Sequence, residues 1–558
     1  MLAQVLAELR ERLAAATLPL DVAGALGARR AAGELVDQID DYILPRLSQI
    51  EAPLLVVLGG STGSGKSTIL NSLVRAQVSP AGVLRPTTRV PVLVCHPDDA
   101  RWFSNDRILP GLARSEGATP SGGRGLHVVS DDDVGPGMAL LDAPDFDSVI
   151  ESNRQLAAQL LAAADLWLFV TTANRYSDAV PWEFLRTARA RATAVAMVLN
   201  RVPPEAADEV PNHLKTMLGE EGLGGSRLFV VKEADLAHGL IPDNEVEALR
   251  GWLTSLAADE AARREVVWKT LGGALESIPA RVDLVALGIE SQIEAVADLE
   301  RSVAASYGNA LSDVDRAIDS GEVLRGEVLA RWHEIVGTGE LMQNLEAGLN
   351  RLRTRLRQVF TGEPPAAAEV AAAVGDSLQV LIVDGAETAA ERVGENWRAT
   401  PAGRQLLSTT SGLDRASTEI RAAVRDDLRE WQHHVLEMVR TQAGSKRTTG
   451  RVLSFGINGV GAALMIATFA HTGGLTGGEV VIAGGTAALS QKLLEYLFGE
   501  QAVAELTTEA RRDLVARIGR FFNREKERYL NLAHSLAPDP ALADDLRTLA
   551  QRVKGASS

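Results

Sequence analysis

The hydrophobic pattern changes twice along the chain. Residues 1–50 carry leucines at helical spacing, with Leu6, Leu9 and Leu13 on one face, which predicts helices. From Leu54 onward, short continuous apolar runs alternate with helical segments. These runs are Leu54–Leu58, Val90–Cys95, Ala139–Leu141, Leu166–Thr171, Ala194–Leu199 and Leu228–Val231. Such alternation is typical of an α/β domain with a doubly wound, mostly parallel sheet that helices cover on both faces.

After about residue 255 long charged segments with helical periodicity take over through about residue 445 and predict a helical-bundle trunk with coiled-coil packing. Turn signals at 362–365 and 401–403 divide it into several helices. We therefore expect five parts. These are N-terminal helices that pack on the trunk (1–50), an α/β domain (51–255), the trunk (256–445), an apolar hairpin (446–499) and C-terminal helices (500–558).

The hairpin is the candidate membrane segment. No charged residue occurs from Val452 to Gly478, and about 20 apolar residues suffice to span a bilayer. A second uncharged arm runs from Val480 to Gln491, and Lys446, Arg447 and Arg451 before the hairpin predict an anchor entering from the cytoplasmic side. The alternative is a buried hairpin in a soluble bundle. Repeated glycines favour the membrane, since each costs a soluble helix roughly 1 kcal/mol.

The strongest chemical motif lies between the first apolar run and the helical segment that follows it. Residues 60–67, Gly-Ser-Thr-Gly-Ser-Gly-Lys-Ser, match the phosphate-binding pattern G-x-x-x-x-G-K-[ST] at every fixed position. Lys66 is expected to reach the β- and γ-phosphates of a nucleoside triphosphate, and Ser67 to supply a hydroxyl to Mg²⁺. The residues predicted to contact nucleotide here are Gly60, Ser61, Thr62, Gly63, Ser64, Gly65, Lys66, Ser67 and Thr68.

Two downstream segments complete the predicted metal and γ-phosphate site. Thr88, with Thr87 in reserve, precedes the second apolar run, where a nucleotide switch loop would place the threonine that senses γ-phosphate and Mg²⁺. Asp142 ends the run at 139–141 and is expected to hold the Mg²⁺ shell. Lys66 and Thr88 are thus the predicted catalytic residues, and Ser67, Thr88 and Asp142 the predicted metal-site residues.

The candidate base-binding residues end the run at 194–199. Asn200 can hydrogen-bond a purine edge, and the stem of Arg201 can cover the ring. A preference for GTP is expected because Asn200 matches the asparagine of the base-reading N-K-x-D motif. Pro203 stands where the carboxylate of that motif would read guanine, so ATP stays open.

The amino-acid composition limits the class of protein and the cellular compartment that we expect. A length of 558 residues with 46% hydrophobic residues predicts several ordered units, and the net charge of −16 argues against a dedicated nucleic-acid binder. Cys95 is the single cysteine, so no intrachain disulfide can form, and its apolar run predicts a buried strand residue. Charges in the first helical stretch argue against a signal peptide. Arginine and alanine usage is typical of GC-rich genomes such as those of actinobacteria.

The order of these motifs resembles the GTPase domain of bacterial dynamin-like proteins, a family of large GTPases that remodel membranes. The likeness covers about residues 50–255 and includes Thr88-Arg89-Val90-Pro91 and the segment Ala173-Asn174. It implies a Ras-like head, GTP hydrolysis with Mg²⁺, self-association or a paired homologue, and work in fission, fusion or septation on the cytoplasmic face of the cell membrane. The trunk followed by a hairpin is similar to the membrane paddle of bacterial dynamin-like proteins and mitofusins.

Three residues depart from that family pattern. Asp145 stands where the family has a glycine whose N–H meets the γ-phosphate, so a carboxylate would face negative charge there. Gly63 stands where dynamins often have a serine, and Pro203 removes the guanine-reading carboxylate. These departures leave two other hypotheses open: a nucleotide-binding membrane scaffold with little hydrolysis, or an ATPase of another P-loop class.

Overall fold

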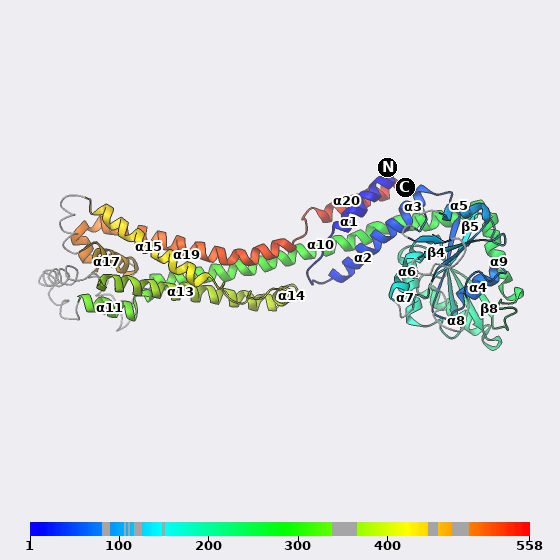
Figure 1. Ribbon diagram of the computed structural model, residues 1–558, viewed down its shortest axis with the longest axis horizontal. Helices are drawn as coiled ribbons and strands as arrows, with labels where there is room; N and C mark the ends of the chain where they lie inside the picture. The colour runs from blue at the N-terminus through cyan, green and yellow to red at the C-terminus, as the bar shows by residue number, and fades with distance from the viewer. Residues whose placement is uncertain are drawn as a thin grey trace. The chain divides into compact units, whose positions relative to one another are not determined.

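The computed structural model describes residues 1–80, 90–104, 108–109, 112–115, 125–147, 151–336, 365–444, 456–470 and 490–557. The chain divides into two compact units (Figure 1). The first comprises Met1–Leu18, Ala23–Ser291 and Pro538–Ser558, and the second comprises Pro19–Val22 and Gln292–Ala537. The 60-residue helix α10, Glu260–Asp319, contributes residues to both units.

Within the described residues, the first unit contains an eight-stranded sheet of order β3-β4-β2-β5-β1-β6-β7-β8. The strands are β1 Leu54–Gly60, β2 Val92–Cys95, β3 Ala113–Ser115, β4 Gly125–Ser130, β5 Met138–Asp142, β6 Leu166–Thr172, β7 Ala194–Val202 and β8 Arg227–Lys232. Central β1 runs parallel to β5 and β6, while β2 is antiparallel to β5. The six predicted strands are confirmed, and β3 and β4 are additional.

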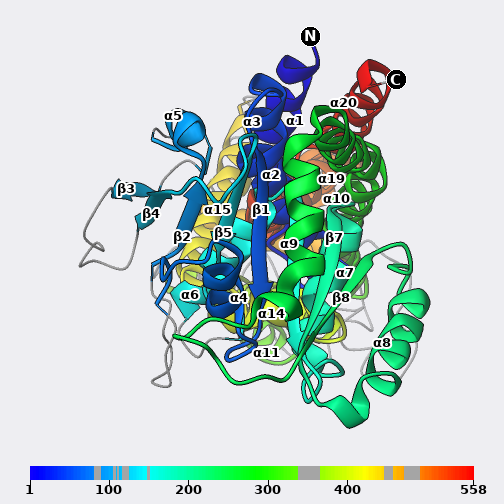
Figure 2. The same cartoon turned by 90° about the vertical axis from the view of Figure 1, so that its right-hand side faces the viewer.

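Helices cover both faces of this sheet, as the continuous apolar runs predicted (Figure 2). They are α4 Lys66–Leu73, α5 Ala100–Phe103, α6 Glu151–Ala162, α7 Ala179–Ala190, α8 Glu209–Glu220 and α9 Asp243–Ala258. Successive residues of β1 point to opposite faces: Val56 packs in the core with α4 and α9, and Val57 packs in the core with α6. Both residues are fully buried, so β1 is apolar along its whole length.

The two ends of the chain meet in the first unit. Helix α1, Leu2–Ala15, packs along α20, Leu542–Ser557, and the two lie side by side in Figure 1. The predicted apolar face is confirmed, because α1 buries Leu6, Leu9 and Leu13. The N-terminal helices continue through α2 Ala25–Gln38, the π-helical turn η1 Ile39–Ile43 and α3 Leu44–Ser48.

All regular secondary structure described in the second unit is helical. Besides the end of α10, its helices include α11 Glu327–Val336, α13 Pro365–Arg398, α14 Pro401–Thr409, α15 Ile420–Gln442, α17 Ile457–Ala470 and α19 Glu500–Leu536. They share one apolar core, in which the ring of Trp397 meets that of Tyr529 edge-on at 5.6 Å between centroids. The break predicted around Pro401–Gly403 lies just before it, at residues 399–400 between α13 and α14. Thr400 caps α14 by accepting a hydrogen bond from the Gly403 N–H at 3.0 Å.

The predicted membrane hairpin is described only in part. Its first arm contains α17, a helix of 14 residues. The side chains from Ala462 to Phe469 are buried, and α17 packs against α13, α15 and α19. The described arm is therefore an apolar helix inside a helical bundle, which was the alternative to a membrane segment. Residues 452–455 and 471–489 lie outside the described part. Across the portion that the structure does describe, no helix combines the length and apolar character needed to cross a membrane.

Candidate nucleotide-binding site

The phosphate loop connects the carboxyl end of β1 to the amino end of α4, as the sequence predicted. Gly63 and Gly65 have positive φ values of 75° and 92°, which other residues rarely adopt. A side chain at Gly60 would collide with the backbone carbonyl of Val170 in β6. The loop is therefore pressed against the sheet, and its glycines are required by conformation and by space.

Lys66 is the first residue of α4, and its ammonium is turned back onto its own loop. Its Nζ donates to the carbonyl oxygens of Gly60 at 2.8 Å and Ser61 at 3.3 Å. It also forms an ion pair with the Asp145 carboxylate. Only 4% of the Lys66 side chain and 14% of the Asp145 side chain are exposed, so the pair is shielded from water. The sequence identified Asp145 as an obstacle to phosphate but did not predict its partner.

Asp142 ends β5 next to the phosphate loop and is completely buried. Its Oδ2 accepts hydrogen bonds from the hydroxyls of Ser67 at 2.5 Å and Ser79 at 2.6 Å. Its Oδ1 has no hydrogen-bond partner among the described residues. Burial raises the pKa of Asp142, against the opposing effects of the Lys66 charge and the two hydroxyls.

These oxygens fit a magnesium ion. Mg²⁺ prefers hard oxygen ligands such as carboxylates and hydroxyls. Ser67 and Asp142 carry such oxygens, and the unpartnered Oδ1 of Asp142 is a buried acceptor that a cation shell would satisfy. Ser79 was missed by the sequence analysis, because a serine in a loop carries no periodic or motif signal.

Asn71 fixes the position of Ser79. The Asn71 side chain is fully buried, and its Oδ1 accepts the N–H groups of Val78 at 3.0 Å and Ser79 at 2.8 Å. Its Nδ2 donates to the Ser79 carbonyl at 2.8 Å and to Gln77 Oε1 at 3.1 Å. One side chain of α4 thus holds the loop that brings the second hydroxyl to Asp142.

Asn200 lies at the end of β7 and contacts the phosphate loop. Its Nδ2 donates to the Ser64 carbonyl at 2.9 Å, and a side chain at Gly65 would collide with the same amide. Its Oδ1 accepts the N–H of Arg201 at 2.9 Å, and Arg201, at φ 53°, is exposed. Of the two predicted base-binding residues, Asn200 therefore contacts the phosphate loop, and Arg201 follows it on the surface.

Arg175 is a second cationic residue that contacts the phosphate loop. Arg175 donates through Nη1 to the Thr62 carbonyl at 2.9 Å and through Nη2 to Asp147 at 3.0 Å. Asp147 also accepts the Thr62 N–H at 2.6 Å and hydroxyl at 2.7 Å. Burial opposes ionisation of Asp147, but the bonds from Thr62 and Arg175 outweigh it and lower its pKa. Both residues were missed; the segment Ala173-Asn174 before Arg175 was the available signal.

Comparison with known proteins gives distant similarities to GTPases. No family model matches the chain. A protein from Arabidopsis thaliana named "Probable transmembrane GTPase FZO-like, chloroplastic" is 24% identical over 170 residues, which are 30% of this chain. The match spans only 17% of that relative's length.

The solved structures that comparison finds include bacterial dynamins. One described as an oligomerised bacterial dynamin pair has a TM-score of 0.43 at 9% identity and covers 96% of this chain and 95% of its own. The bacterial dynamin GTPase LeoA from ETEC has a TM-score of 0.26 at 13% identity and covers 96% and 100%. Era, solved with MgGDPNP and ribosomal RNA nucleotides, has a TM-score of 0.25 at 18% identity over 36% of this chain and 56% of its own. All three TM-scores are below 0.5.

The predicted residues Thr68 and Thr88 contribute little to the described geometry of the site. Thr68 lies in the first turn of α4, where its carbonyl accepts the Ser72 hydroxyl at 2.6 Å. Thr87 and Thr88 lie outside the described residues, so the predicted role of Thr88 stays a prediction.

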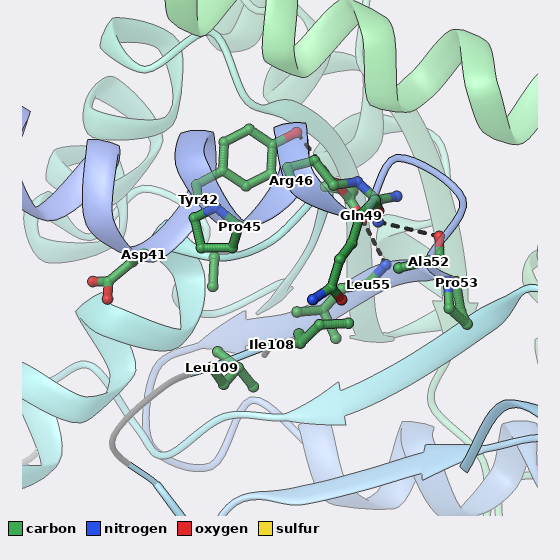
Figure 3. A pocket seen from close by; sticks show the side chains of 12 residues that line it. Asp41, Tyr42, Pro45, Arg46, Gln49, Ala52, Pro53, Leu55, Ile108 and Leu109 are labelled. Carbon is green, nitrogen blue, oxygen red and sulfur yellow. Dashed lines mark hydrogen bonds and ion pairs between the residues drawn. The ribbon is translucent and has the colours of Figure 1, made fainter. Parts of the chain in front are cut away.

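A small cavity at the other end of β6 is structural (Figure 3). Its volume is about 20 Å³, room for about one water molecule. The buried ion pair of Arg46 with Asp165 lies beside it, 3.1 Å from Nε to Oδ1. Asp165 also accepts the Leu55 N–H at 2.8 Å and the Tyr42 hydroxyl at 3.2 Å. This network ties the N-terminal helices to the sheet.

Proposed function

We propose that this protein is a membrane-associated, dynamin-like GTPase that binds Mg²⁺-GTP in its first unit. The observation that carries the proposal is the phosphate loop between β1 and α4, with Lys66 and Ser67 opening the helix and Asp142 bonded to Ser67. A helix amino terminus, an ammonium and converging backbone N–H groups together favour a polyphosphate.

The residues take distinct roles in this proposal. Lys66 releases the loop carbonyls and binds the β- and γ-phosphates, while Ser67 and Asp142, joined by Thr88, hold the metal shell. Bound Mg²⁺ supplies charge neutralisation for the triphosphate. Lys66 then stabilises negative charge that grows on the leaving diphosphate as water attacks the γ-phosphorus. Asn200 meets the purine edge and the Arg201 stem covers the ring.

The membrane half of the proposal rests on the uncharged sequence from Val452 to Gly478 and on the similarity to a relative named as a transmembrane GTPase. In this proposal, the hairpin contacts the bilayer at the cytoplasmic face of the cell membrane, which requires α17 to leave its packing against α13, α15 and α19. Nucleotide-dependent association with a second copy or a paired homologue drives fission, fusion or septation.

The test is GTP turnover by the full chain with and without liposomes, compared with Lys66→Ala. Turnover lost in the variant and liposome co-sedimentation of both forms are expected. Lack of Mg²⁺-dependent binding of any purine triphosphate would refute the nucleotide site. Failure of both forms to bind liposomes would remove the membrane half alone. Competition of ATP against GTP tests base preference, since Pro203 leaves an ATPase open.

A second function is favoured by one contact. The ion pair between Lys66 and Asp145 occupies the ammonium that hydrolysis requires. A nucleotide-responsive membrane scaffold with little hydrolysis would have this arrangement. Tight GTP binding with turnover no faster than that of Lys66→Ala would support the scaffold over the GTPase.

A further inference from the structure

Asp145 occupies the position from which a carboxylate can compete with a terminal phosphate. Its carboxylate forms the ion pair with Lys66, while the carbonyls of Gly60 and Ser61 accept hydrogen bonds from the same ammonium. The ammonium that would bridge the β- and γ-phosphates therefore already has one protein anion as a ligand.

The two residues that follow Asp145 are both anchored. Phe146 is 1% exposed and stacks on Phe184 at 4.3 Å and on Phe169 at 5.5 Å between ring centroids. Asp147 is bonded to the backbone and the hydroxyl of Thr62 in the phosphate loop itself. The backbone at Asp145 is thus held in place from its carboxyl side.

The start of the same segment is held as well. Asp142 is bonded to Ser67 and Ser79, and the Ala143 N–H donates to the Leu58 carbonyl at 3.2 Å. Removing the Asp145 carboxylate from the loop therefore requires rotation of its own side chain or loss of one of these anchors.

From the ion pair with Lys66 and the anchored segment around it, we infer that Asp145 is a specificity-determining residue. It makes the site bind nucleoside diphosphates in preference to nucleoside triphosphates. The inference rests on the proposed nucleotide site. A β-phosphate can bind the backbone N–H groups of the loop while Asp145 keeps its contact with Lys66. A γ-phosphate adds negative charge where the carboxylate lies, and like charges at that separation in a shielded site repel strongly.

The experiment measures dissociation constants of GDP and of the non-hydrolysable analogue GMPPNP, both with Mg²⁺, for the full chain and its variants. Asp145→Asn removes the charge at constant size, Asp145→Gly removes the side chain, and Asp145→Glu keeps the charge. Asp133→Asn is the matched control, because Asp133 is exposed in the turn before the amino end of β5, while Asp142 marks its carboxyl end. Circular dichroism and thermal unfolding confirm that each variant is folded.

We expect Asp145→Asn and Asp145→Gly to tighten GMPPNP binding relative to GDP by at least tenfold. Asp145→Glu and Asp133→Asn should stay within about threefold of the native ratio. If Asp145→Gly does not fold, Asp145→Asn decides. An unchanged ratio in Asp145→Asn, or equal tightening for both nucleotides, overturns the inference and leaves the proposed function standing. Absence of binding of either nucleotide to every protein overturns the proposed function and this inference with it.

Discussion

The buried pair of Arg46 and Asp165 offers a sharp test of what holds the first unit together. The two side chains are 8% and 2% exposed, and the carboxylate also accepts the N–H of Leu55 in β1. Burial raises the pKa of Asp165, and the Arg46 charge opposes this. Replacing one partner leaves a charged or polar group buried without compensation, which costs about 3–5 kcal/mol.

We therefore predict that Asp165→Asn destabilises the first unit by about 3 kcal/mol, because the amide can still accept from Leu55 but cannot neutralise Arg46. Arg46→Met should cost a similar amount, since it also loses the donor to the Ala52 carbonyl at 3.1 Å. In the double variant neither charge is stranded. Its cost should therefore fall short of the sum of the single costs by about 2 kcal/mol.

The assay is native-state hydrogen exchange of peptides from β1, which reports on the first unit alone. A loss of about 3 kcal/mol should accelerate exchange of the most protected β1 amides by roughly 100-fold. Peptides from α13 in the second unit serve as the internal reference and should be unaffected. Single variants within about 1 kcal/mol of the native protein, or strictly additive effects in the double variant, would contradict this reasoning.

Three further outcomes are expected. Ser79→Ala should weaken Mg²⁺-dependent nucleotide binding by about tenfold, through the lost hydroxyl on Asp142, and leave Mg²⁺-free binding unchanged; calorimetry with and without Mg²⁺ checks this. Gly65→Ala should abolish nucleotide binding, because its φ of 92° and the adjacent Asn200 amide exclude a side chain; fluorescent-nucleotide titration would refute this by showing native affinity. Burial and the nearby Asp37 raise the pKa of Asp41 to about 6, above its unfolded value of 3.8, so its ionisation destabilises the fold. Asp41→Asn should therefore raise the free energy of unfolding by about 1 kcal/mol at pH 7.5, a value reduced to allow for the partial exposure of Asp41. This stabilisation should shrink below pH 6 and vanish near pH 3.8. Thermal unfolding across this pH range measures it, and a stabilisation that does not change with pH would contradict the assignment.

The central strands and the phosphate loop were predictable because their signals are local. Continuous apolar runs mark strands that are buried on both faces, and the spacing of glycines with Lys66 and Ser67 encodes the loop in eight successive residues. The position of Asp142 beside Ser67 followed from parallel strands ending at one edge of the sheet.

The missed features depend on contacts between distant residues. Strand β4 was not predicted because His127 interrupts its short apolar pattern, and three-residue β3 carries the charged Arg114. Ser79 reaches Asp142 only through the bonds of Asn71, which no spacing rule reveals. The ion pair of Asp145 with Lys66 likewise joins positions 79 residues apart.

The apolar hairpin shows a different kind of ambiguity. A helix that is apolar on all sides suits both a lipid phase and the middle of a bundle, so composition alone does not separate them. The described helix α17 is covered by α13, α15 and α19. Glycine can serve this packing too: a side chain at Gly461 would collide with Leu436 of α15.

The pairing of α1 with α20 makes the second unit an insertion, in sequence, within the first. A fragment that ends at Ser291, made to isolate the sheet, would lack α20 and so lose the packing of α20 against the apolar helix α1. Such a fragment should expose apolar surface and aggregate. A variant that keeps α1 and α20, with the second unit replaced by a short flexible linker, is expected to yield a soluble, folded first unit.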